Sequence, residues 1–514
     1  MYARIRWAFA LVTLALGACG GADQTTYELS GNISGLAGAG LMLSDGNGHE
    51  LTVPSGATSF TFPTPAAAGT AYNISVTQQP GGSPKQACSI ENPSGTLTSN
   101  SSSAAVHCVG PFVYVSTVNG VSGFVMNAST GALTQMAGSP FQAGAGVPSL
   151  LVHPSLHFAY GPNPVSGGIY AWEISSGSGV LEPIAGSPFD TSADPYNLTI
   201  DSTGRFLYAV GYGTGVITAY TIDPTTGALT QIAGSPYPVE TCPPCYTLVS
   251  TLTIDPSGKY AYLANYESYP GSTILGYAID GTTGALQPLS GSPYPVPGMS
   301  ASRLVIDPSG KFLFTVGDTG ADVFTIDGST GVLSLVPGSP FPAGAFPAGD
   351  SLSIHPNGKF LYLFCPSGPS RFSTHYQVIV DSIDPSSGVL TPVPGSPFAY
   401  DGGAPVAFNF SADEKFAYSY TGNTYSQDLD GFSIDPDTGA IVLVATYNGG
   451  WASALDPSKK FLYVSSNVLS GAGTIVAYAI DPDTHALTPI AQPDGGYPTG
   501  SSQSSFFLTI TNPN

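Results

Sequence analysis

The fold is decided by the stretch Ser302-Arg-Leu-Val-Ile-Asp-Pro-Ser-Gly-Lys-Phe-Leu-Phe-Thr-Val, followed by Asp322-Val-Phe-Thr-Ile-Asp, Thr330-Gly-Val-Leu and Gly338-Ser-Pro-Phe. Each apolar run is short, rich in Val, Ile or Phe, and bounded by Gly, Pro, Asp or Ser, as β-strands between turns are. The stretch therefore predicts four strands. The same pattern recurs about every 50 residues, and four-stranded units repeated radially form a β-propeller.

We label the strands of one unit a, b, c and d from the propeller axis outward. Eight b strands are recognised, starting at Phe112, Phe158, Phe206, Tyr260, Phe312, Phe360, Phe416 and Phe461. The first unit begins at its b strand, so we expect the C-terminal run Phe506-Phe-Leu-Thr-Ile-Thr to supply the missing a strand and close the ring. The sequence thus predicts an all-β chain with an eight-bladed β-propeller over residues 111–512.

Residues 27–109 lack this repeat. Short strand-like runs there, separated by Gly, Asn and Pro, suggest a small β-sandwich, after a linker at residues 20–26. The segment resembles the small Ig-like modules near the N-termini of bacterial surface lipoproteins. Cys88 and Cys108 flank its last hairpin, and in an oxidising compartment we expect them to form a disulfide; two buried free thiols are the alternative.

The N-terminus, residues 1–19, has the pattern of a signal peptide. Arg4 and Arg6 precede an apolar stretch from Trp7 to Leu16 that is too short to span a bilayer. The Leu-Gly-Ala-Cys sequence ending at Cys19 resembles a lipobox, which implies lipidation of Cys19 and an outer-membrane or cell-surface lipoprotein. The lipid would then be the only membrane contact. An ordinary secretory signal that happens to contain a Cys is the alternative.

The composition narrows the classes of partner. The 514 residues carry a net charge of −21, which would repel a phosphate backbone, so nucleic acid is excluded as a partner. The 64 Gly and 46 Pro residues sit at fixed offsets between apolar runs, which indicates turns and not disorder. The a–b turns and c–d hairpins are nearly uniform, as turn chemistry requires, whereas the b–c loops and d–a crossovers vary and are where binding is expected.

Few basic residues are available for that variable face. Most of the 12 Lys and Arg residues occupy the turn before a b strand. Arg303, at the start of an a strand, and Arg371, in a long b–c loop, are the exceptions in the propeller. They are the candidate ligands for a carboxylate or phosphate; surface residues paired with nearby Asp are the alternative.

The repeat resembles the lactonase-type β-propeller family, which includes 6-phosphogluconolactonases. The resemblance rests on Asp255-Pro-Ser-Gly-Lys-Tyr, Asp307-Pro-Ser-Gly-Lys-Phe, c strands such as Tyr277-Ala-Ile-Asp, and the Thr-Gly-Ala-Leu hairpins. It implies seven blades, which is the alternative to our count of eight. It also implies a site at Arg303 and Asp318, but Ser302 stands where the family has a His, so the catalytic set is incomplete.

The remaining signals are weaker. Cys242 and Cys245 lack the second ligand pair of a zinc site, so a local disulfide is expected, which leaves Cys365 unpaired. No metal or other cofactor is expected. We predict a surface-anchored binding or scaffold module for a small molecule, a glycan or an envelope protein. A lactonase-like hydrolase or isomerase acting on a sugar or other lactone is the alternative, so whether the protein is an enzyme stays open.

Overall fold

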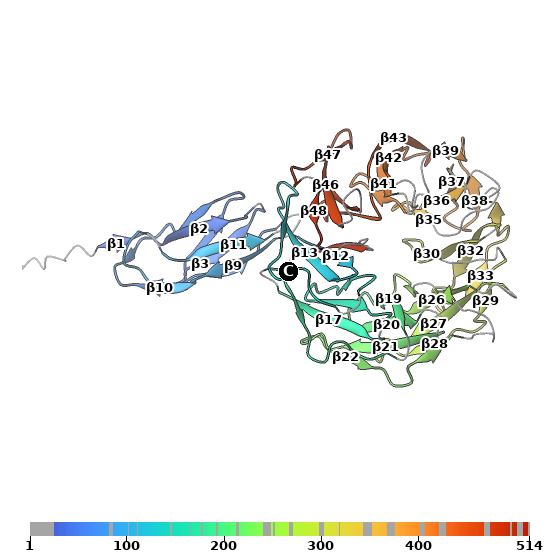
Figure 1. The fold of residues 1–514 in the computed structure, drawn as a ribbon, viewed down its shortest axis with the longest axis horizontal. Helices are drawn as coiled ribbons and strands as arrows, with labels where there is room; N and C mark the ends of the chain where they lie inside the picture. Colours follow the sequence, from blue (N-terminus) through green and yellow to red (C-terminus); the bar gives the residue numbers. More distant parts are fainter. Residues whose placement is uncertain are drawn as a thin grey trace, which may run out of the picture.

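Two parts are visible in the computed structural model: an elongated N-terminal unit and a ring of sheets around a central opening (Figure 1). The regular elements of its described residues are all β-strands. The structure describes residues 25–36, 38–81, 86–100, 102–109, 111–143, 146–165, 167–175, 178–191, 194–211, 215–239, 248–249, 252–266, 271–297, 303–317, 319–342, 352–366, 376–400, 407–420, 428–466, 473–493, 496–500 and 507–511. No helix among these residues is long and apolar enough to cross a membrane.

The N-terminal unit consists of short sheets around one core. Its sheets have the strand orders β5-β2-β11-β9, β4-β3-β8, β1-β6 and β10-β7. The strands are β1 (Thr26–Tyr27), β2 (Ser30–Ser34), β3 (Leu41–Ser44), β4 (Glu50–Val53), β5 (Ser59–Thr61), β6 (Ala66–Ala67), β7 (Ala71–Asn73), β8 (Ser75–Gln78), β9 (Ala87–Glu91), β10 (Ser94–Thr96) and β11 (Ala105–Val109). Ile33, Leu43 and Val106 bring the two larger sheets into one buried cluster. The likeness to Ig-like modules stays a prediction.

The described residues between 112 and 511 form eight antiparallel sheets, which we number 1 to 8 in chain order. Sheet 1 contains β12 (Phe112–Thr117), β13 (Gly120–Met126), β14 (Leu133–Gln135) and β49 (Phe507–Thr511), and sheet 2 contains β15 (Leu151–Val152), β16 (Phe158–Pro162), β17 (Ile169–Ile174) and β18 (Leu181–Pro183). Sheet 3 contains β19 (Pro195–Ile200), β20 (Phe206–Gly211), β21 (Val216–Ile222), β22 (Leu229–Gln231) and β23 (Tyr237–Pro238). Sheet 4 contains β24 (Leu248–Val249), β25 (Thr253–Ile254), β26 (Tyr260–Tyr266), β27 (Thr273–Ile279), β28 (Leu286–Pro288) and β29 (Tyr294–Pro295).

Sheets 5 to 8 follow the same plan, with the a, b, c and d strands in order and, in three of them, a short fifth strand beside c. Sheet 5 contains β30 (Leu304–Ile306), β31 (Phe312–Gly317), β32 (Gly320–Ile326), β33 (Leu333–Leu335) and β34 (Phe341–Pro342). Sheet 6 contains β35 (Leu352–Ile354), β36 (Phe360–Pro366), β37 (Tyr376–Ile383), β38 (Leu390–Pro392) and β39 (Phe398–Tyr400), and sheet 7 contains β40 (Asn409–Phe410), β41 (Phe416–Tyr420), β42 (Asp428–Ile434) and β43 (Ile441–Asn448). Sheet 8 contains β44 (Ala452–Leu455), β45 (Phe461–Ser466), β46 (Thr474–Ile480), β47 (Leu487–Pro489) and β48 (Tyr497–Pro498).

The b strands are apolar without alternation because neighbouring sheets cover both of their faces. β12 and β31, for example, are buried at every residue. The buried clusters accordingly combine neighbouring sheets, as where Tyr114 of β12 packs with Trp172 of β17. Each of the eight b strands starts at the residue that the sequence indicated.

The two ends of the ring meet in sheet 1. β49 pairs antiparallel with β12, with Phe112 opposite Thr511 and Ser116 opposite Phe507. The hydroxyl of Tyr463, in sheet 8, donates to the carbonyl of Gly131, in sheet 1, at 2.7 Å. The two ends of the ring are thus joined in one sheet, and that sheet is hydrogen-bonded to sheet 8.

The Tyr463 bond is one of six hydrogen bonds that each link a b strand to the c–d hairpin of the next sheet. The donors and acceptors are Tyr114 to Gly179, Tyr160 to Gly227, Tyr208 to Gly284, Tyr262 to Gly331, Tyr418 to His485 and Tyr463 to Gly131. The interpretation of these hairpins as turn chemistry alone was therefore incomplete. A Cβ on Gly131, whose φ is 72°, would lie 2.5 Å from the Phe461 ring, so the glycine also allows close packing of sheets.

Candidate functional site

The sequence-predicted site residues are only partly within the described structure. Arg303 is described. Arg371, Asp318, Cys19 and the pair Cys242 and Cys245 all lie outside the described residues, so their roles stay predictions. Cys88 and Cys108 are described and lie in the N-terminal unit. The site can therefore be built from Arg303 and its described surroundings.

Arg303 is exposed and directly precedes β30, the a strand of sheet 5. Its charge acts on Tyr420, the last residue of β41 in sheet 7: burial raises the pKa of Tyr420, and the guanidinium partly offsets that rise. Sheets 5 and 7 are separated by sheet 6, so the two side chains come from either side of one intervening sheet. The Tyr420 hydroxyl is neutral at neutral pH, as an ordinary tyrosine is, and can donate a hydrogen bond.

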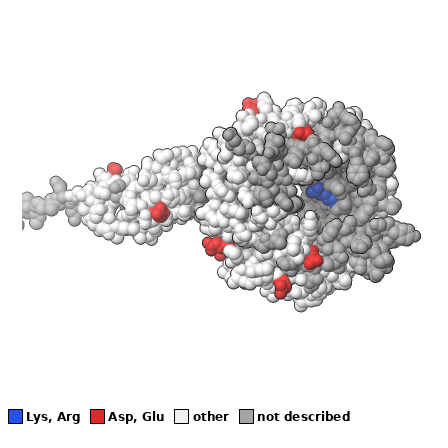
Figure 2. Space-filling model, in the orientation of Figure 1, with Lys and Arg blue, Asp and Glu red and all other residues white. Residues whose placement is uncertain are grey.

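The surroundings of the central opening are electrostatically distinct from the rest of this face. Figure 2 shows basic atoms within the opening and acidic atoms on the surrounding surface. In a chain of net charge −21, a positive charge at this place favours an anion or a polarised carbonyl oxygen.

Two buried carboxylates lie on the c strands of the same two sheets. Asp322, on β32, and Asp430, on β42, are both essentially inaccessible to solvent and stand four residues before the end of their strands. Asp430 accepts a hydrogen bond of 2.6 Å from the Thr446 hydroxyl. Asp322 lies opposite Thr315 on the neighbouring b strand. Both carboxylates are thus buried within their sheets.

Most other acidic residues of the described ring lie in turns on the opposite face. In the c–d hairpins one carboxylate oxygen accepts hydrogen bonds from the backbone, as where Asp327 accepts from the Thr330 amide at 2.8 Å. Hydrogen bonds from the hydroxyl groups of Ser329 and Thr330, together with those from their amides, hold the pKa of Asp327 at about 2. In the a–b turns Asp307 similarly accepts from the Phe312 amide at 2.7 Å. The acidic residues of the described ring thus serve largely in turns. No cluster of three potential metal ligands occurs among the described residues.

Two other basic side chains of the described ring link turns. Arg205 donates to the Gly281 carbonyl at 2.5 Å, and Lys459 donates to the Ser411 carbonyl at 3.2 Å. The four histidines described in the ring lie in a–b turns or in a c–d hairpin, away from the opening; they are His153, His157, His355 and His485. The described part of the ring therefore brings no imidazole to Arg303.

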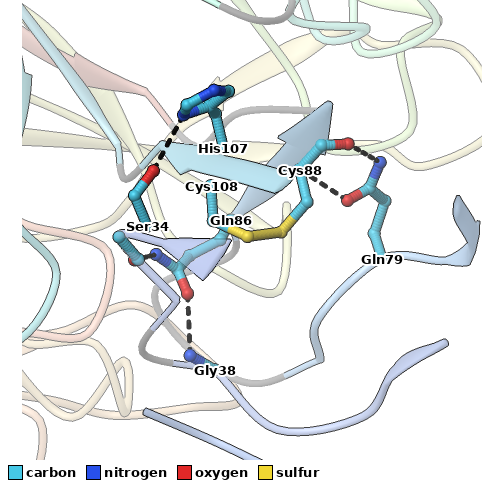
Figure 3. Close-up of a disulfide and its surroundings, with 8 residues drawn as sticks. Ser34, Gly38, Gln79, Gln86, Cys88, His107 and Cys108 are labelled. Carbon is cyan, nitrogen blue, oxygen red and sulfur yellow. Dashed lines mark hydrogen bonds between the residues drawn. A yellow bond between two sulfur atoms is a disulfide. The ribbon is translucent and has the colours of Figure 1, made fainter. Parts of the chain in front are cut away.

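The predicted disulfide between Cys88 and Cys108 is present and joins opposite positions of β9 and β11 (Figure 3). Beside it, Ser34 and His107 are hydrogen-bonded at 2.8 Å, and the other ring nitrogen of His107 lies 3.3 Å from a Glu91 carboxylate oxygen. His107 is 48% exposed and Glu91 67% exposed. Water competes for these hydrogen bonds, so the side chains of Ser34, His107 and Glu91 contribute little to stability beyond ordering the surface of the sheet.

Tyr420 and Asp381 were not identified from the sequence. Tyr420 ends a b strand whose other residues are core, so nothing local separated it from them. Asp381 lies two residues before the end of its c strand, where the other seven sheets have an aromatic side chain; these are Phe124, Trp172, Tyr220, Tyr277, Phe324, Phe432 and Tyr478. Aligning the eight units would have revealed Asp381. It is 2% exposed, and burial raises its pKa to about 6.

Comparisons with solved structures agree with the ring. A candidate 6-phosphogluconolactonase from Bacteroides fragilis is 20% identical, with a TM-score of 0.50, over 66% of this chain and 95% of that one. A second, from Bacteroides uniformis, is 16% identical with a TM-score of 0.49, over 66% and 96%. The periplasmic gluconolactonase of Pseudomonas aeruginosa is 20% identical with a TM-score of 0.47, over 66% and 97%. At these identities the likeness concerns the fold alone.

The sequence comparisons match a smaller part of this chain. No curated protein matches this chain. One family does match, described as "Lactonase, 7-bladed beta-propeller", over residues 155–365. That segment runs from sheet 2 to the b strand of sheet 6 and includes Arg303. Its described strands, with the rest of the ring, form antiparallel sheets of four to six strands, which are consistent with a propeller. Residues 155–365 are therefore similar to the lactonase β-propeller family. They lie in an all-β ring with eight described sheets, whereas the family is described as seven-bladed.

Proposed function

We propose that this protein is a lactonase-like hydrolase whose site lies at the central opening, beside Arg303. One observation carries the proposal: the segment that matches the lactonase family contains the one cation found beside an a strand in the described ring. This reverses the order of the sequence-based hypotheses, in which a binding or scaffold module came first. The family match supports hydrolysis more than it supports a purely structural role.

In this proposal the substrate is a cyclic ester. Arg303 and the neutral Tyr420 hydroxyl donate hydrogen bonds to the carbonyl oxygen, whose negative charge grows as water adds to the carbonyl carbon. Asp318, predicted from the sequence, takes the proton of the attacking water. The ring C–O bond then breaks, the leaving oxygen takes a proton, and the product is an open-chain hydroxy acid. Its new carboxylate is repelled by a chain of net charge −21, which favours release.

The test is hydrolysis of a panel of sugar and aliphatic lactones by wild type and by Arg303→Ala. Loss of one donor to a developing oxyanion typically reduces turnover by about 10²- to 10³-fold. Lys311→Ala is the matched control, because Lys311 is an exposed cation in the a–b turn of the same sheet, on the opposite face. Hydrolysis that survives Arg303→Ala would contradict the assignment of the site.

A second candidate is a non-catalytic module that binds an anionic small molecule or glycan, or an envelope protein. The observation in its favour is that the described ring brings no histidine to Arg303. Under this candidate, no lactone is hydrolysed above background, and Arg303→Ala weakens the binding of a hydroxy-carboxylate. Lactone turnover that depends on Arg303 would exclude it.

The same proposal covers the number of blades, the role of the N-terminal unit and the attachment to a membrane. We infer that each of the eight sheets is one blade, and that the extra blade widens the opening relative to a seven-bladed relative. The N-terminal unit would act as a stalk, and a lipid on Cys19 would hold the protein at the outer membrane or cell surface. The site would then face substrates outside the cytoplasm.

A further inference from the structure

The outer edge of sheet 7 differs from every other edge of the ring. The other seven d strands contain three residues each; they are β14, β18, β22, β28, β33, β38 and β47. β43, the d strand of sheet 7, contains eight residues, from Ile441 to Asn448. Four of the short strands end in proline, which cannot extend a ladder of hydrogen bonds and so protects the edge. β43 contains no proline.

The greater length of β43 has a structural cause. In the other sheets a returning segment pairs with the beginning of the c strand, as where β34 pairs with β32 in sheet 5. In sheet 7, β43 itself continues there, with Leu429 opposite Tyr447 and Asp428 opposite Asn448, past a register shift at Gly431. The result is one long outer strand whose single partner among the described strands is β42.

This strand is apolar and accessible. Val442 is 64% exposed, Leu443 40% and Val444 54%, and they are consecutive. The other large exposed apolar side chains in the described residues, Val165, Tyr196 and Leu335, are scattered singly. A long, β-branched, unprotected edge strand is a template for pairing with another strand.

We propose that β43 pairs antiparallel with β43 of a second copy of this chain. The argument for this occupant is charge: residues 441–448 carry none, although the chain as a whole has a net charge of −21. Two copies can therefore meet here without opposing carboxylates on the paired strands, whereas most of their surface repels. A two-fold axis at Val444 would pair Leu443 with Ala445 and Ile441 with Tyr447 of the second copy, with no like charges opposite each other.

The expected dimer is weak. One pair of strands buries less than the roughly 1,200 Å² of a standard interface, so the dimer should form in the micromolar range. The proposal does not depend on the function proposed for Arg303, which lies in sheet 5.

The test is the molar mass of the full-length chain by light scattering and sedimentation over a range of concentrations. Wild type should double in mass as the concentration rises. Val444→Lys should raise the dimer Kd about tenfold or more, because two ammonium groups would face each other on the axis. Val444→Glu should do the same. An equimolar mixture of the two variants should regain the dimer, since the paired charges are then opposite.

Thr230→Lys is the matched control, because Thr230 is exposed on the short d strand of sheet 3; it should leave the dimer unchanged. Three outcomes would overturn the proposal: a wild-type chain that stays monomeric throughout, a dimer unaffected by Val444→Lys, or a mixture of the charge variants that stays monomeric. Capture of an extended peptide by monomeric wild type would likewise assign the edge to a different occupant.

Discussion

Asp381 offers a quantitative test of the packing between sheets 5 and 6. Its carboxyl group occupies the place of an aromatic ring and is 2% exposed. Burial raises its pKa to about 6 from the ordinary value of 3.8. The neighbouring thiol of Cys365 is also buried, with its pKa raised to about 12, and remains neutral. The folded chain therefore holds the Asp381 proton more tightly than the unfolded chain does.

The sign of the pH dependence follows from this. The contribution of Asp381 is most favourable below pH 3.8 and is lost as the pH rises through about 6. Above that, ionising the buried carboxyl costs on the order of 3 kcal/mol. Asp381→Asn removes the ionisation. Its stability relative to wild type should thus increase by about 3 kcal/mol between about pH 3.5 and pH 7.5, or about 3 to 4 °C in Tm for a ring of this size.

The assay is thermal and urea unfolding of both proteins at several pH values. Asp384→Asn, in the c–d hairpin of the same sheet, is a control whose stability relative to wild type should change with pH in the opposite direction. Hydrogen bonds from Ser386 and Ser387 lower the pKa of Asp384, so its contribution is present above the ordinary pKa and lost on acidification. A stability difference between Asp381→Asn and wild type that does not change with pH would refute the reasoning.

Two further predictions concern the ends of the chain. Deleting residues 507–514 removes β49 and exposes the edge of β12, so the Tm should fall far more than for loss of an ordinary tail, and an unchanged Tm would contradict closure by pairing. Replacing Cys19 by Ala should release the protein from membrane fractions of expressing cells, because the predicted lipid is its only anchor; unchanged partition would exclude lipidation at that residue.

The sequence determined the strands and turns. Alternation of short apolar runs with Asp-Pro-Ser-Gly and Thr-Gly signals is local chemistry, so the eight b strands could be located to the residue. It could not show that the hairpin glycines also receive the aromatic ring and tyrosine hydroxyl of the preceding sheet. That role depends on how neighbouring sheets pack.

Only the tertiary structure decided which distant side chains meet. Arg303 was predicted as a site residue because basic residues are rare outside the turns, but its neighbour Tyr420 is more than a hundred positions away and on a different sheet. The effect of the Arg303 charge on Tyr420 depends on how sheets 5 to 7 are arranged, which leaves no local pattern in the sequence. The burial of Asp381 and the exposed edge of β43 likewise depend on what surrounds each strand, since the same apolar or acidic residue can lie inside or outside a ring.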